Sequence, residues 1–162
     1  MFIFFYMGGI FLGLGSNLGD RQKYLDDAMR FLEERGVKIL KKSSVYETDP
    51  VGMPEHIDQL NGQPKFLNMA VEVLTDLSPE ELLRICLDIE NKLGRVRKKR
   101  WESRVIDIDV LLYQDRKIQT DFLTIPHPRM HEREFVMKPL EEIRKLHRAG
   151  EHFGILKRVI NS

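Results

Sequence analysis

The feature that most constrains this chain is residues 95–109, where a basic segment leads directly into an apolar one. Six of the first ten residues are basic and one is acidic. After them, Val105 to Leu112 is β-branched and aliphatic except at Asp107 and Asp109, a composition that predicts a strand. Because strand side chains alternate between faces, the two aspartates should point the same way, roughly 7 Å apart at the Cα. The opposite face should then enter a core through Ile106, Ile108 and Val110.

Two neighbouring carboxylates repel each other and are costly to desolvate, and a bound divalent cation removes that cost. Oxygen ligands suit Mg²⁺, which usually shares its coordination sphere with substrate phosphates. Arginines bind phosphate oxygens bidentately, so the adjoining basic segment supplies the complementary groups. Taken alone, an Asp-x-Asp strand is usually a solvated face and a basic run is usually an exposed loop. Together they favour phosphate chemistry or nucleic-acid binding.

Charge distribution favours the first of these two alternatives. The 162 residues carry a net charge of +1. Residues 95–104 alone carry +5, so the remainder carries −4, and the positive field is local. A local field suits a small anionic ligand better than a long nucleic-acid backbone. The length and the 42% hydrophobic content fit a single domain, 1–162, with its core at about residues 10–145.

The single cysteine and the N-terminus bear on location. Cys86 excludes a disulfide framework and a cysteine-based zinc site, and it is expected as a small buried residue. Met1 to Leu14 is apolar, lacks the basic start and cleavage site of a signal peptide, and is short for a membrane span. A cytoplasmic protein with no membrane contact is expected.

The first half of the chain predicts a strand at Ile10–Leu14, a turn at 15–20 and a helix capped by Asp20 that runs to about Arg35. A second strand is expected at Val37–Tyr46, followed by a long loop, Glu47–Lys65, of the kind that is often functional.

A third strand is expected at Phe66–Leu74. Ser78-Pro79-Glu80-Glu81 then predicts a capping box and a helix to Leu93, which Gly94 ends. Glu90 lies in the last turn of this helix, where the helix dipole disfavours an acid, and we expect it to position the arginines that follow.

Beyond the aspartate-bearing strand, a turn near Gln114-Asp115 leads to Lys117–Thr120. Residues 125–130 cannot be helical because two prolines flank His127 and fix its surroundings, which makes this histidine a candidate phosphate donor. Met137–Arg144 is expected to be helical. The order strand, helix, strand, strand, helix, strand predicts an α+β, ferredoxin-like βαββαβ fold with an antiparallel sheet, both helices on one face and long loops at the site.

Several short segments, in order, resemble the 6-hydroxymethyl-7,8-dihydropterin pyrophosphokinase family of folate biosynthesis. They are Gly15-Ser16-Asn17-Leu18-Gly19, Ser43-Ser44-Val45-Tyr46-Glu47-Thr48, Gln63-Pro64-Lys65-Phe66-Leu67-Asn68, Gly94-Arg95-Val96-Arg97, Arg104-Val105-Ile106-Asp107-Ile108-Asp109 and Pro126-His127-Pro128-Arg129-Met130, followed by Arg133 and Phe135. The resemblance implies transfer of a pyrophosphoryl group from ATP to the hydroxymethyl oxygen of the pterin, with release of AMP.

The resemblance also implies roles for individual residues. Asp107 and Asp109 hold two Mg²⁺ ions, and Arg95 and Arg104 act on the phosphates in catalysis. Other nucleotide-binding positions are Glu90, Trp101, His127 and Arg133. The pterin-binding positions are Thr48, Asp49, Val51, Phe66, Asn68 and Phe135, with the flat ring stacked between the two phenylalanines. ATP and the pterin are the expected partners, nucleic acid is not, and a monomer is expected.

Two other classes of function remain as alternatives. A small RNA-binding module needs aromatic side chains exposed on its sheet, whereas most aromatics here fall in apolar runs. A ferredoxin-like regulatory domain that only senses nucleotide has no need of Asp107, Asp109 and His127.

Overall fold

The computed structural model describes residues 8–50, 62, 64–94 and 105–144. Its strands and helices are β1 (Ile10–Ser16), α1 (Arg21–Glu34), β2 (Lys38–Lys42), β3 (Tyr46–Thr48), β4 (Phe66–Leu74), α3 (Pro79–Lys92), β5 (Asp107–Tyr113), β6 (Ile118–Gln119), β7 (Thr124–Ile125) and the 3-10 helix η2 (Met130–Glu132). A further helix covers 134–144. Most of the long loop and of the basic segment therefore lies outside the described residues.

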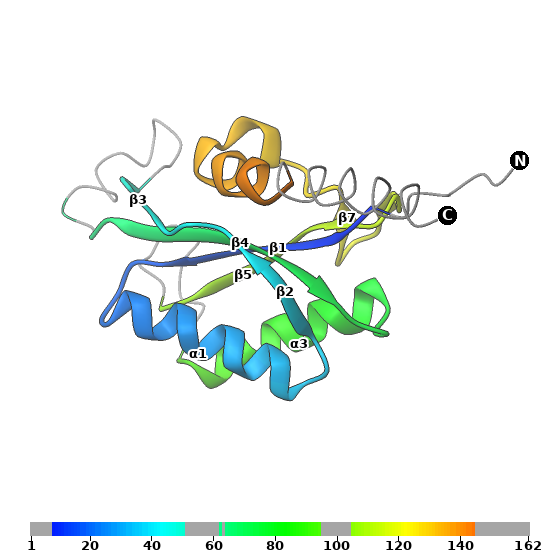
Figure 1. Ribbon diagram of the computed structural model, residues 1–162, viewed down its shortest axis with the longest axis horizontal. Coiled ribbons are helices and arrows are strands. Elements are labelled where there is room, and N and C mark those ends of the chain that lie inside the picture. The colour runs from blue at the N-terminus through cyan, green and yellow to red at the C-terminus, as the bar shows by residue number, and fades with distance from the viewer. Residues whose placement is uncertain (1–7, 51–61, 63, 95–104, 145–162) are drawn as a thin grey trace, which may run out of the picture.

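The main sheet has the order β2-β4-β1-β5, and β3 also pairs with β4. Every one of these pairings is antiparallel. The order and the two connecting helices are those of the predicted ferredoxin-like α+β fold, which is confirmed. Figure 1 shows α1 and α3 together on one face of the sheet, as expected.

Both connecting helices begin and end where their local chemistry predicts. Asp20 caps α1 by accepting a hydrogen bond from the Lys23 N–H. Ser78 and Glu81 form the predicted capping box at the start of α3. Gly36 and Gly94, just beyond the two helices, have φ values of +80° and +101°, a conformation that glycine adopts without the strain of a side chain.

The sheet separates two apolar clusters. The larger one joins α1 and α3 to the sheet through fully buried residues such as Leu12, Leu25, Leu82 and Ile106. The smaller one lies on the other face, where Phe11, Ala70 and Leu111 pack with Leu140 and Ile143 of the 134–144 helix. This helix is orange in Figure 1 and lies across the sheet from α1 and α3. In the described part of the chain, no helix is both long and apolar enough to cross a membrane.

Three boundaries differ from the prediction. β1 continues through Gly15 and Ser16, which were expected in a turn, because both pair with β4. The predicted strand Val37–Tyr46 is two strands, since residues 43–45 leave the ladder, and the second of them, β3, continues to Thr48, inside the predicted loop Glu47–Lys65. The last helix begins at 134 rather than at Met137.

The segment after β5 turns at Gln114, whose φ is +52°, and forms a small hairpin of β6 and β7. Residues 126–129 are not helical, as the prolines predict, although Met130 begins a short 3-10 helix. The Ile125–Pro126 peptide bond is cis. The His127 N–H donates to the Leu111 carbonyl at 3.0 Å, which fixes the segment to β5.

Candidate active site

The strand register places the predicted metal-binding and pterin-binding residues on one face of the sheet. Asp107 pairs with Gly15, Gly15 with Asn68, and Asn68 with Tyr46, so these residues form one row across four strands. Directly paired residues share a face. At about 4.8 Å per strand, Asp107 and Asn68 lie roughly 10 Å apart along this row.

The next row contains the second aspartate. Asp109 pairs with Gly13, which pairs with Ala70. Asp107 and Asp109 are both half-buried, and the intervening Ile108 is buried on the opposite side with the core of α1 and α3. The prediction that the two carboxylates point the same way while the isoleucine and valine point away is confirmed.

Glycines on β1 let neighbouring side chains pack directly over the strand between the carboxylates and Asn68. A Cβ atom added at Gly15 would lie 2.9 Å from Oδ1 of Asn68, and one added at Gly13 would lie 3.3 Å from Cδ1 of Leu111. The alternation of glycine along β1 therefore indicates close approach of other groups to one strand face. Sequence reasoning missed this signal because Gly15 was taken as part of the turn.

The pterin-side residues meet where β3 joins β4. Thr48 pairs with Phe66, and Nδ2 of Asn68 donates to Oγ1 of Thr48 at 2.6 Å. Between β3 and the 134–144 helix lies a cavity of about 320 Å³. Its lining residues are Tyr46, Glu47, Thr48, Asp49, Glu134, Phe135, Lys138 and Pro139. Three predicted pterin-site residues, Thr48, Asp49 and Phe135, therefore line one cavity.

At the aspartate end of the row, the charges of Asp109 and Arg133 both affect the pKa of His127. Burial lowers the pKa of His127, the Asp109 carboxylate opposes that change, and the positive charges of Arg133 and Arg129 reinforce it. The guanidinium of Arg133 lies 5.7 Å from the centre of the Phe135 ring. Arg133 thus interacts with a residue on each side of the site, one predicted to bind phosphate and one predicted to bind pterin.

Glu90 has a contact that sequence reasoning did not foresee. It is buried, with 2% of its surface exposed, and its Oε1 accepts a hydrogen bond from the Ile108 N–H at 2.8 Å. Ile108 lies between the two aspartates, so Glu90 holds the backbone that presents them. The arginines it was expected to position lie outside the described residues. Cys86 is buried as predicted, and burial raises its pKa.

The predicted residues Val51, Arg95, Trp101 and Arg104 lie outside the described part of the chain. Within the described residues, no group of three or more His, Cys, Asp or Glu side chains could hold a metal ion. Two half-buried carboxylates on one face of the sheet nevertheless fit Mg²⁺, which completes its coordination with water and substrate phosphates.

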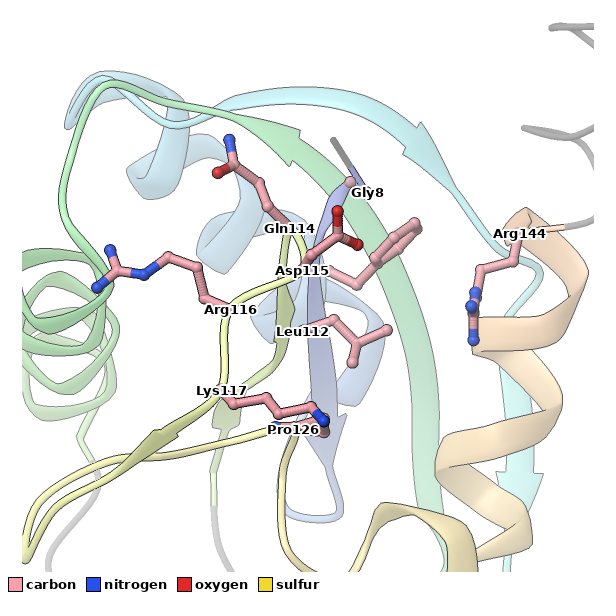
Figure 2. Close-up of a pocket in the computed structure, with 10 residues that line it drawn as sticks. Gly8, Leu112, Gln114, Asp115, Arg116, Lys117, Pro126 and Arg144 are labelled. Atoms are coloured by element: carbon pink, nitrogen blue, oxygen red, sulfur yellow. The ribbon is translucent and has the colours of Figure 1, made fainter. Parts of the chain in front are cut away.

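A second cavity, about 410 Å³, lies at the other end of the β1–β5 pair and is shown in Figure 2. It is lined by residues from β1, from the end of β5 and the segment after it, and by Arg144 of the last helix. The described residues that line it include none of the predicted site residues. Asp107, Asn68 and Thr48, by contrast, lie toward the other end of the sheet.

The fold and these groups first define a class, an α+β protein whose antiparallel sheet carries paired carboxylates and a cavity lined in part by Tyr46 and Phe135. Residues 11–145 match the model of the family "7,8-dihydro-6-hydroxymethylpterin-pyrophosphokinase (HPPK)". The chain therefore belongs to the 7,8-dihydro-6-hydroxymethylpterin-pyrophosphokinase family.

Relatives agree with this assignment. The chain is 49% identical over 134 residues to the 2-amino-4-hydroxy-6-hydroxymethyldihydropteridine pyrophosphokinase of Bacillus subtilis (strain 168), covering 82% of this chain and 76% of that protein. It is 42% identical over 137 residues to the protein of the same name from Aquifex aeolicus (strain VF5), covering 85% and 81%.

A solved structure described as HPPK-DHPS in complex with substrates supports the fold. It aligns with a TM-score of 0.63 at 17% identity, covering 83% of this chain but only 39% of that longer chain. The predicted function, pyrophosphoryl transfer in folate biosynthesis, is confirmed by the family and its relatives. The RNA-binding and nucleotide-sensing alternatives find no support.

Proposed function

We propose that this chain transfers pyrophosphate from ATP to the hydroxymethyl oxygen of 6-hydroxymethyl-7,8-dihydropterin and releases AMP, with the residue roles given below. The observation that carries the proposal is the single row from Asp107 through Gly15 to Asn68. The row supports the proposal because Asp107 and Asn68 share one face of the sheet at a separation that a flat acceptor and its hydroxymethyl arm can span.

On the nucleotide side, Asp107 and Asp109 are the residues that would hold two Mg²⁺ ions. When bound there, the ions supply charge neutralisation at the attacking and leaving oxygens. Glu90 keeps the aspartate-bearing strand in place through the Ile108 N–H. His127 and Arg133 serve as phosphate donors beside Asp109, and Arg95, Arg104 and Trp101 complete the nucleotide site by resemblance to the family.

On the acceptor side, Phe66 and Phe135 stack on the pterin ring. Asn68 is oriented by its bond to Thr48 and pairs with the donors and acceptors at the ring edge. Asp49 and Val51 complete this wall by resemblance. No covalent intermediate is needed, because placing the hydroxymethyl oxygen in line with the phosphate and stabilising the developing charge suffice.

The setting of the reaction is also part of the proposal. The chain acts as one domain, 1–162 with its core at about 10–145, as a cytoplasmic monomer that depends on Mg²⁺. In the described part of the chain, α1 and α3 lie on one face of the sheet and the 134–144 helix lies over part of the other (Figure 1), an arrangement that does not favour an exposed aromatic surface for RNA.

The test is to incubate the protein with ATP, Mg²⁺ and 6-hydroxymethyl-7,8-dihydropterin and to identify the nucleotide product. AMP in equal amount to the pyrophosphorylated pterin is expected, and a chelator should abolish both. Formation of ADP, or AMP released at the same rate without the pterin, would refute pyrophosphoryl transfer to this acceptor.

A further inference from the structure

The carboxylate of Glu142 joins the 134–144 helix to the segment between β2 and β3. Its Oε2 accepts a hydrogen bond from the Ser44 N–H at 2.6 Å. Its Oε1 accepts one from the Tyr46 hydroxyl at 2.7 Å. One side chain therefore fixes two points of a segment that is almost one hundred residues away in the sequence.

The segment needs such a partner because it leaves the strand ladder. β2 ends at Lys42 and β3 begins at Tyr46. Ser43 is tied to β4, since its N–H donates to the Ala70 carbonyl and its Oγ accepts from the Ala70 N–H, both at 2.9 Å. The N–H of Ser44 donates to Glu142 instead, which provides the acceptor that a neighbouring strand would otherwise supply.

The same helix face carries one wall of the pterin-side cavity. Phe135, Lys138 and Glu142 follow one another at helical spacings of three and four, so they share a stripe. Phe135 and Lys138 line the cavity, and the Lys138 ammonium lies 5.2 Å from the centre of the Tyr46 ring. Tyr46 and Thr48 line it from the β3 side. Glu142 therefore fastens the two walls together next to the cavity.

The charges favour this arrangement at neutral pH. The hydrogen bond from Tyr46 lowers the pKa of Glu142, and the bond to Glu142 raises the pKa of Tyr46. The pair is thus a protonated donor and an ionised acceptor, and hydrogen bonds to an ionised acceptor are shorter and stronger than neutral ones.

We propose that Glu142 is a positioning residue for the acceptor site, which sets Thr48 of β3 at a fixed distance from Phe135 of the helix. This inference rests on the proposed pterin site. Glu142 needs no contact with the substrate, because it acts through Ser44 and Tyr46. Its effect should fall on acceptor binding and leave the nucleotide side, which is built on β5 and the 126–133 segment, unchanged.

The test compares Glu142→Ala with Glu141→Ala, a change at the exposed neighbouring residue of the same helix. Glu142→Ala should raise the KM for the pterin by roughly tenfold or more, because misplacing binding groups by an ångström can cost up to about 100-fold. The KM for ATP should stay within about twofold, and Glu141→Ala should match the wild type in both constants. Unchanged pterin KM, or equal losses for both substrates, would overturn the proposal.

Two further variants keep the test decisive if Glu142→Ala folds poorly. Glu142→Gln keeps an acceptor without the charge, and Tyr46→Phe removes one hydroxyl. In a double-mutant cycle on pterin affinity, measured by calorimetry with a non-hydrolysable ATP analogue present, their effects should be less than additive. Strict additivity would show that Tyr46 acts independently of Glu142 and would contradict the proposed mechanism.

Phe135→Ala separates this inference from the site on which it rests. If Phe135→Ala leaves pterin affinity unchanged, the proposed acceptor site itself is wrong. If Phe135→Ala weakens pterin binding while the Glu142 variants do not, the acceptor site stands and the positioning role of Glu142 is refuted.

Discussion

Asp109 is the residue on which catalysis should depend most clearly. It shares one face of the sheet with Asp107, and its charge raises the pKa of His127. Replacing Asp109 with Asn removes the charge of a proposed metal ligand, so kcat should fall by roughly 100-fold or more, which corresponds to about 3 kcal/mol of transition-state stabilisation. The rate of AMP formation at saturating substrates measures this effect. Asp115→Asn, an exposed change beyond the far end of β5, should have little effect. A normal rate for the Asp109 variant would exclude it as a metal ligand.

A second prediction about a single residue concerns Gly15. A methyl group there would approach Oδ1 of Asn68 to 2.9 Å and displace that side chain from Thr48. Gly15→Ala should therefore raise the KM for the pterin by up to about tenfold, the cost of one hydrogen bond, and leave the KM for ATP unchanged. Steady-state kinetics with each substrate varied in turn measure both constants. An unaltered pterin KM would mean that Asn68 does not form hydrogen bonds with the pterin.

Individual residues were predictable from sequence where local pattern determines their direction. The outward aspartates of β5 follow from strand alternation alone. Glu90 shows the limit, because its position in the last turn of α3 marked it as unusual, whereas its partner, the Ile108 N–H, depends on how α3 packs against β5. The hydrogen bonds that Glu142 accepts could not be inferred for the same reason, since their donors are remote in sequence.

At the scale of elements, caps and turns were predicted well because they are short-range. The capping box of α3 gives a stability prediction. Ser78→Ala removes the acceptor for the Glu81 N–H, which lies 3.2 Å away, and should cost about 1 kcal/mol. For a chain of 162 residues this lowers Tm by about 2–4 °C. Calorimetry and urea unfolding check it, and an unchanged urea midpoint would show that the box does not stabilise the fold.

Strand ends were predicted less well because long-range pairing determines them. β1 includes Gly15 and Ser16 since β4 offers partners at Asn68 and Leu67. β2 and β3 separate because Ser43 bonds to Ala70 and Ser44 to Glu142, neither of which a local pattern reveals. The helix at 134–144, which packs on the second face of the sheet, was expected only from Met137, so Phe135 was predicted to bind the pterin but not to belong to this helix.

At the scale of the whole molecule, one face of the sheet holds the main core and the other holds both the smaller core and the proposed site. The hydrogen bonds from Ser44 and Tyr46 to Glu142, which join the 134–144 helix to the segment between β2 and β3, should make stability sensitive to acid. The pKa of Glu142 is lowered in the folded state, so its contribution is present above the ordinary carboxyl pKa of about 4.5 and is lost as pH falls through the lower folded value.

The measurement is the free energy of unfolding, from urea titrations between pH 7 and pH 3, for the wild type and Glu142→Gln. The wild type should be more stable at pH 7, and the difference should shrink in acid as Glu142 is protonated. A difference that stays constant over this range would show that ionised Glu142 contributes nothing to folding.

The account as a whole depends on one face of one sheet serving both substrates. A crystal structure with Mg²⁺, a non-hydrolysable ATP analogue and 6-hydroxymethyl-7,8-dihydropterin tests this directly. We expect metal ions bound by Asp107 and Asp109 and the pterin ring between Phe66 and Phe135, with its hydroxymethyl oxygen directed toward the bound phosphates. Ions bound away from the two aspartates, or a pterin outside the cavity between β3 and the 134–144 helix, would contradict the account.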